Sequence, residues 1–253
     1  MRQLIFILIL LTGTNCFASS HFDILKDTLS TFVTLTQFKS KLETKFNDFR
    51  LSRKNERLSR PLDFGFSQTV FEIEISYDKS YVKEFRVFLV TSNDSIVLGN
   101  IQELDYYDKV KKSENYITVN QKITNYLNQH KEKYGLELSL KDFFRQLTEL
   151  IIYGFGCSEG GEYYPPEAKQ MKDFVNTQNY DKLARWLRQI SPELQAYAVD
   201  GLFQLASKGI ATKQVDKELI QYLKKRNSDV YHCSGCIYGI TTTIEEILKW
   251  KQK

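Results

Sequence analysis

The residues best suited to chemistry in this sequence are three cysteines and one histidine. His232, Cys233 and Cys236 lie within five positions of each other, whereas Cys157 lies far upstream in a glycine-rich stretch. Cysteine and histidine side chains form redox couples, zinc sites and activated nucleophiles, and paired cysteines form structural disulfides. These residue types therefore allow four interpretations, which depend on which side chains the fold brings together.

A structural disulfide from Cys157 to Cys233 or Cys236 is the leading interpretation. It would close a loop of about 76 to 79 residues, worth about 4.5 kcal/mol if loop-closure entropy is the cause. The sequence leaves the connectivity open, and one cysteine would stay outside the pair. Such a disulfide would tie the two ends of the predicted helical region together.

The first alternative is a thiol–disulfide redox protein that uses Cys233 and Cys236 as a CxxC pair. Such pairs need one thiol with a lowered pKa, usually at a helix N-terminus, and Cys157 would act as a resolving thiol. Thioredoxin-like proteins place the motif after a strand. Here a predicted helix that ends at Arg226 precedes it, which disfavours this alternative.

The second alternative is a structural zinc site. The four ligands would be Cys157, His232, Cys233 and Cys236. Four protein ligands around Zn²⁺ leave no position for a reactive water, so this site would stabilise the fold. A cysteine nucleophile built on Cys157 and His232 is a further alternative, but no motif fixes its geometry. We therefore expect no catalytic residues and no cofactor.

The first 18 residues predict a signal peptide. Arg2 supplies the positive charge, Leu4–Leu11 is an apolar run, and cleavage is expected after Ala18. A membrane-spanning helix needs about 20 apolar residues, so this run is too short, and no later segment qualifies. Lipidation at Cys16 is the alternative. We expect a periplasmic or secreted protein in an oxidising environment.

Composition and charge favour an ordinary globular protein. Hydrophobic residues make up 42% of the chain, and 35 basic against 31 acidic residues give a net charge of +4. This balance disfavours nucleic acid as a partner, because nucleic-acid binding requires a clustered basic surface. Protein is the expected partner.

Residues 19–110 predict a small α+β unit. Apolar residues at helical spacing over residues 22–49 indicate an amphipathic helix with a break near Thr36. Alternating apolar residues over 66–99 indicate a three-stranded antiparallel meander. On its second face, Glu72 and Glu74 are expected to face solvent. The basic stretch from Arg50 to Arg60 is expected to be a solvated loop.

Residues 111–253 predict a helical domain. Gly135 is expected to end one helix, Ser139 and Asp142 to form a capping box, and Ser191 to cap a later helix. Small residues at Ala198 and Gly201 would allow close helix packing. His130 lies on an apolar helix face, where a packed histidine is expected.

The stretch SPELQAYAVDGLFQLASKG, within residues 180–226, resembles the second half of a HEAT-type repeat in its proline, small-residue and leucine positions. The resemblance implies stacked antiparallel helices, as in binding scaffolds. We therefore expect an α+β unit followed by an all-α, HEAT-like domain stapled by a disulfide. The predicted function is an exported, non-enzymatic binding or structural protein. Its binding surface is expected in the groove between the two parts or on the concave face of the helix pairs.

Overall fold

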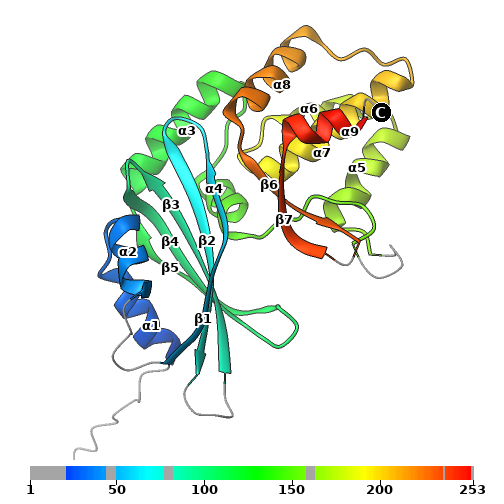
Figure 1. Ribbon diagram of the computed structural model, residues 1–253. Helices are drawn as coiled ribbons and strands as arrows, with labels where there is room; N and C mark the ends of the chain where they lie inside the picture. The colour runs from blue at the N-terminus through cyan, green and yellow to red at the C-terminus, as the bar shows by residue number, and fades with distance from the viewer. Residues whose placement is uncertain (1–20, 44–49, 77–81, 158–162, 236, 252–253) are drawn as a thin grey trace, which may run out of the picture.

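The computed structural model describes residues 21–43, 50–76, 82–157, 163–235 and 237–251. Figure 1 shows two regions side by side. One is a long twisted sheet with helices on both faces. The other is a cluster of helices with a two-stranded hairpin.

The sheet is a five-stranded antiparallel meander in which each strand pairs with the next one in the chain. Its strands are β1 (Arg50–Pro61), β2 (Phe66–Ser76), β3 (Val82–Ser92), β4 (Ser95–Leu104) and β5 (Val110–Thr118). Side chains of a strand alternate between the two faces, so Phe71 and Ile73 are buried on one face while Glu72 lies on the other.

Two short helices cover the face that carries Phe71. They are α1 (His21–Ser30) and α2 (Leu35–Glu43), which confirms a helical segment broken before Thr36. Phe22, Leu25 and Phe38 from these helices are fully buried against the sheet. This burial supplies the apolar cover that an isolated meander lacks in water.

The second face of the sheet is covered only in part. Near the β1–β2 turn it contacts α3 (Asn120–Tyr134) and α4 (Leu140–Thr148), through a cluster that includes Phe66, Tyr126 and Phe143. Further along the strands, Leu58, Val70 and Phe88 pack against Tyr231 of the hairpin. Beyond this cluster the face carries charged side chains.

The remaining helices surround α7 (Pro192–Ser207), whose first eleven residues are all buried. Its neighbours are α5 (Pro166–Asn176), α6 (Tyr180–Leu187), α8 (Gln214–Arg226) and α9 (Ile244–Lys251). A Cβ atom on Gly201 would lie 2.5 Å from Leu183 Cδ2, so the α6–α7 contact requires a glycine there. This confirms the role expected for a small residue.

The predicted helix ends agree with the structure. Gly135 ends α3 in the left-handed region, with φ 65°, and Ser139 forms a capping box with Asp142 at α4. Ser191 accepts a hydrogen bond from the backbone N–H of Leu194 at the start of α7. Local capping chemistry is visible in the sequence because all its partners lie within four residues.

The predicted fold class is wrong. The sheet has five strands over residues 50–118 rather than three, and the C-terminal region is not all-α. A hairpin of β6 (Asp229–Ser234) and β7 (Ile237–Thr243) separates α8 from α9. The basic stretch expected to be a loop is β1. Because β1 lies at the edge of the sheet, it carries few apolar residues, and the sequence pattern therefore did not indicate a strand.

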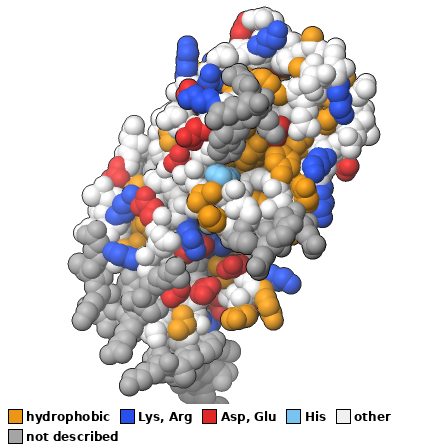
Figure 2. Space-filling model, turned by 45° about the vertical axis from the view of Figure 1, so that its right-hand side comes forward, with side chains coloured by type: hydrophobic (Ala, Val, Ile, Leu, Met, Phe, Trp, Pro, Cys, Tyr) orange, Lys and Arg blue, Asp and Glu red, His pale blue; other side chains and the backbone are white. Residues whose placement is uncertain are grey.

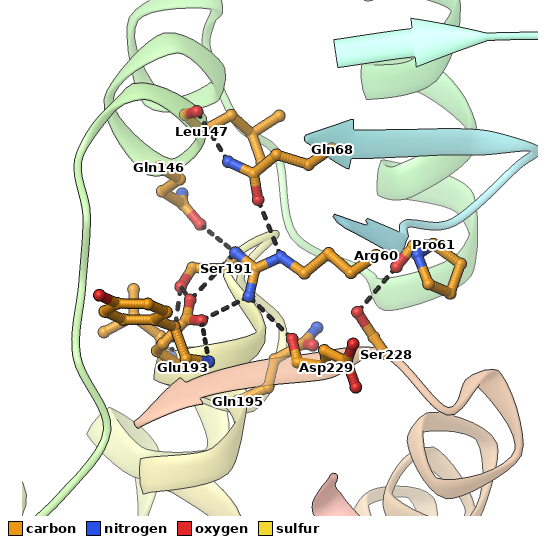
Figure 3. A network of polar contacts seen from close by, with 12 residues as sticks. Arg60, Pro61, Gln68, Gln146, Leu147, Ser191, Glu193, Gln195, Ser228 and Asp229 are labelled. Atoms are coloured by element: carbon orange, nitrogen blue, oxygen red, sulfur yellow. Dashed lines mark hydrogen bonds and ion pairs between the residues drawn. The ribbon is translucent and has the colours of Figure 1, made fainter. Parts of the chain in front are cut away.

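An ion pair buried between the two regions joins the sheet to the helices (Figure 3). Arg60 in β1 contacts the carboxylate of Glu193 in α7 and donates a 2.8 Å hydrogen bond to Gln68 and a 2.9 Å bond to the carbonyl of Asp229. Glu193 also accepts a 3.0 Å bond from the backbone N–H of Tyr231. Four elements therefore contact one buried ion pair, and both of its charged groups have hydrogen-bond partners.

A second buried carboxylate lies in the β1–β2 turn. Asp63 is 2% exposed and accepts hydrogen bonds from Tyr134, Tyr222 and Arg226, at 2.7 to 2.9 Å. Phe64, the next residue, has φ 58°, a left-handed backbone conformation that is strained for a residue other than glycine. The turn thereby binds α3 and α8 to the end of the sheet.

Candidate functional site

An extended segment between α4 and α5 lies alongside the hairpin. The N–H of Tyr153 donates to the carbonyl of Tyr231 at 2.9 Å, and the N–H of Cys233 donates to the carbonyl of Tyr153 at 3.0 Å. Leu150 and Ile152 pack toward the sheet, whereas Tyr153 belongs to the core of the helical region. The segment therefore separates the sheet from the helices, and we call it the wall.

A disulfide between Cys157 and Cys233 fastens this wall to β6, with 5.6 Å between the Cα atoms. A Cβ atom on Gly154 would overlap Cys233 Sγ and lie 2.9 Å from Cys157 Sγ, so only glycine fits beside the sulfurs. The hydroxyl of Tyr197 accepts a 2.9 Å bond from the N–H of Gly154 and lies 2.9 Å from the carbonyl oxygen of Ile152. The wall is held on both sides.

The disulfide bears on the interpretations made from the sequence. Because Cys233 is bonded to Cys157, it does not form the local pair with Cys236 that the redox alternative requires. His232 lies in β6, and burial lowers its pKa. Among the described residues, no group of three or more His, Cys, Asp and Glu side chains is placed to hold a metal ion. Cys236, Cys16 and the predicted cleavage site at Ala18 lie outside the described residues.

A cavity of about 690 Å³ lies between the charged part of the sheet and this wall. Leu150, Ile152 and Tyr231 line it on the side of the wall, and Tyr107 and Tyr163 lie at its margin. Its volume lies within the range of about 300 to 1,000 Å³ that is usual for small-molecule sites. The groove between sheet and wall is therefore large enough for a ligand.

Charged side chains from three strands form the floor of the cavity. Arg57 in β1 and Arg86 in β3 both donate to Glu72 in β2, and the Arg86 bond is 3.1 Å long. Glu74 and Glu84 lie opposite each other one row further along the same strands. Figure 2 shows acidic side chains gathered beside basic ones on the lower half of the face that it presents.

Burial and charge have opposite effects on the pKa of Arg57 in this floor. Burial of the Arg57 side chain would lower its pKa, but the hydrogen bond and the charge of Glu72 outweigh it, so the pKa is raised. Burial raises the pKa of Tyr231. Arg57 therefore stays charged and Tyr231 stays neutral at neutral pH.

Gly239 in β7 lies beside two residues that line the cavity, Tyr231 and Arg57. Gly239 has φ 79°, and a Cβ atom there would lie 2.9 Å from Tyr231 Oη and 3.5 Å from Arg57 Nη1. A larger residue would therefore push the hydroxyl end of Tyr231 aside, whereas it would only touch Arg57. A glycine permits both the backbone conformation and the close approach.

Sequence analysis found part of this site and misjudged it. Glu72 and Glu74 were expected to face solvent, but they line the cavity, and Glu72 is paired with two arginines. Arg57 was assigned to a solvated loop. The alternation of Glu72 with Phe71 and of Arg86 with Phe85 is the signal that identifies this face, but the wall above it comes from residues far away in the chain.

A second cavity, of about 550 Å³, lies among α4, α5 and α6. Trp186 and Phe174 line it, with their rings edge to face and 5.2 Å between centroids. Burial raises the pKa of Glu167 at its margin. It corresponds to the other expected location, on the helix pairs, but it is smaller than the first cavity.

No family model, curated protein or solved structure matches the sequence. The HEAT-type resemblance of residues 180–226 is therefore not supported. Within the ranges that the structure describes, no helix has both the length and the apolar character that crossing a bilayer requires.

Proposed function

We propose that this chain is an exported, non-enzymatic binding protein whose ligand occupies the cavity between the sheet and the disulfide-held wall. The cavity itself is the observation that carries the proposal. It combines ligand-sized volume, aromatic and aliphatic walls, and a charged floor, which are the features of a binding site. Among the described residues that line the cavity, none is a histidine or cysteine that would act as a base or nucleophile.

Export is supported by two observations. The apolar run Leu4–Leu11 with Ala18 at a cleavage position predicts a signal peptide. The disulfide between Cys157 and Cys233 fits the oxidising environment that an exported protein meets. Expression with the native N-terminus and an intact-mass measurement tests both: we expect cleavage after Ala18 and the loss of two hydrogens for the disulfide.

Ligand binding is tested by a thermal-shift screen of polar metabolites and short peptides on the exported protein. The matched variant is Asn55→Trp, because Asn55 lies on β1 at the cavity and an indole there would occupy part of the space that a ligand needs. Ser59→Trp is the control, since Ser59 is exposed on the same strand and does not line the cavity. We expect at least one compound to raise the Tm of the wild type and of Ser59→Trp but not of Asn55→Trp. A compound that stabilises all three equally would bind elsewhere.

A further inference from the structure

The cavity floor has two rows of charge with opposite sign. In the first row, Arg57 and Arg86 both donate to the single carboxylate of Glu72, and the charge of Asp108 also acts on Arg57. Arg57 lies at a bulge in the pairing of β1 with β2, a feature that re-aims side chains. The row spans three strands, so its geometry is fixed by the sheet.

Arg86 is the buried member of this row. The residue is 8% exposed and lines the cavity, and its Nε atom has no hydrogen-bond partner among the described residues. A guanidinium has five N–H donors, and Glu72 accepts only part of those offered by the two arginines. A buried donor without an acceptor is costly. A carboxylate that entered beside Glu72 would supply acceptors to this row.

The second row has the opposite sign. Glu74 lies directly opposite Glu84 in the β2–β3 register, and both line the cavity. Like charges directly opposite each other destabilise a sheet. Each carboxylate has about four acceptor positions, so it can accept from a ligand in addition to neighbouring groups. An ammonium group placed here would donate hydrogen bonds to these carboxylates.

The spacing of the rows sets the length of the ligand. Glu72 and Glu74 are two residues apart on one strand face, a separation of about 7 Å. The ends of an extended dipeptide are also about 7 Å apart, because each residue spans about 3.3 to 3.6 Å. Tyr107, Tyr163 and Ile152 around the cavity would contact the side chains of such a ligand.

We infer that the cavity binds a zwitterionic ligand, a dipeptide, with its carboxylate at Arg57 and Arg86 and its ammonium at Glu74 and Glu84. This inference rests on the proposed binding function and names its ligand class. A purely cationic ligand is the competing outcome, because the described lining has two arginines against Glu72, Glu74, Glu84 and Asp108.

Isothermal titration calorimetry on the full exported protein tests the inference with three probes. Alanyl-alanine carries both charges, its N-acetyl derivative lacks the ammonium, and its C-terminal amide lacks the carboxylate. We expect alanyl-alanine to bind. The affinity of each blocked probe should be lower by at least about tenfold, because each loses charge-assisted hydrogen bonds. Binding of the amide at equal or higher affinity would show a cation site and overturn the inference.

A pair of variants locates the ammonium. Glu84→Gln should weaken alanyl-alanine about tenfold and leave the N-acetyl probe unchanged, because only the first ligand has an ammonium to lose. Glu103→Gln is the control: Glu103 pairs with Lys83 at 2.8 Å and does not line the cavity. If none of the three probes binds, the peptide inference fails. The proposed function is judged separately, by the metabolite screen with Asn55→Trp, so the two failures can be told apart.

Discussion

Arg60 in β1 and Glu193 in α7 form an ion pair in which each side chain is only 3% exposed, although 133 residues separate them in the chain. Both charges keep hydrogen-bond partners around them, which buried charges require. The pair lies between the sheet and the helical region, so it fixes the two regions against each other. The cavity depends on this arrangement, because its floor and wall come from different regions.

Removal of one partner of this pair should be costly. We expect Glu193→Gln to lower the free energy of unfolding by about 3 to 5 kcal/mol, because Arg60 would keep a buried and uncompensated charge. Urea denaturation measures the loss. Glu137→Gln is the matched control, since Glu137 pairs with Lys131 while both side chains are more than half exposed. That change should cost much less, because solvent screens an exposed ion pair. Equal losses would show that the buried pair does not stabilise the fold.

The burial of Arg60 illustrates what the sequence conceals. Arg60 ends a run of basic residues that resembles a solvated loop, and nothing near it in the chain indicates Glu193 as a partner. The strand β5 is concealed in the same way, because most of its residues are exposed and polar. By contrast, the Ser139 cap and the Gly135 helix end were predicted correctly, since their partners are local. Long-range pairing, rather than local propensity, decided both the fold-class error and the wrong interpretation of Arg57 as part of a solvated loop.

The disulfide should carry a large share of the stability. We expect the double variant Cys157→Ala, Cys233→Ala to lose about 4.5 kcal/mol if loop-closure entropy dominates, since the bond spans 76 residues. Denaturation of this variant beside the wild type measures the loss. Cys236→Ala is the control and should change the free energy of unfolding little. A loss for Cys236→Ala equal to that for Cys233→Ala would instead indicate a bond to Cys236.

A side chain at position 154 should destabilise the protein while the disulfide is present. We expect Gly154→Ala to cost about 1 to 3 kcal/mol, because its Cβ atom would overlap the sulfur of Cys233 and crowd that of Cys157. The same substitution in the Cys157→Ala, Cys233→Ala background should cost less, although the carbonyl oxygen of Cys233 remains 2.9 Å away. Denaturation of the wild type and the three variants gives the coupling energy. A coupling near zero would contradict the close packing of Gly154 against the sulfurs.

His130 should make the protein sensitive to mild acid. The side chain is fully buried, and its ring stacks on Tyr134 with 4.4 Å between centroids. Burial lowers its pKa below the ordinary value of 6.5, while the nearby Asp63 and Arg226 act in opposite directions on it. The unfolded chain therefore binds a proton at a pH where the folded chain does not. The contribution of His130 to the free energy of unfolding is therefore complete above pH 6.5. It decreases as the pH falls from this value toward the pKa of the folded state.

His130→Phe tests this dependence, because phenylalanine keeps the stacking on Tyr134 and removes the titration. Urea denaturation at pH 7.5 and at pH 5 should show a larger loss for the wild type than for the variant. The difference should approach about 1.4 kcal/mol for each unit by which the folded pKa lies below the unfolded one, within that interval. His232, whose pKa burial also lowers, titrates in the same direction and is present in both proteins, so it does not affect the difference. Equal losses in the two proteins would show that His130 gains its proton without cost and that the packing around its ring opens in acid.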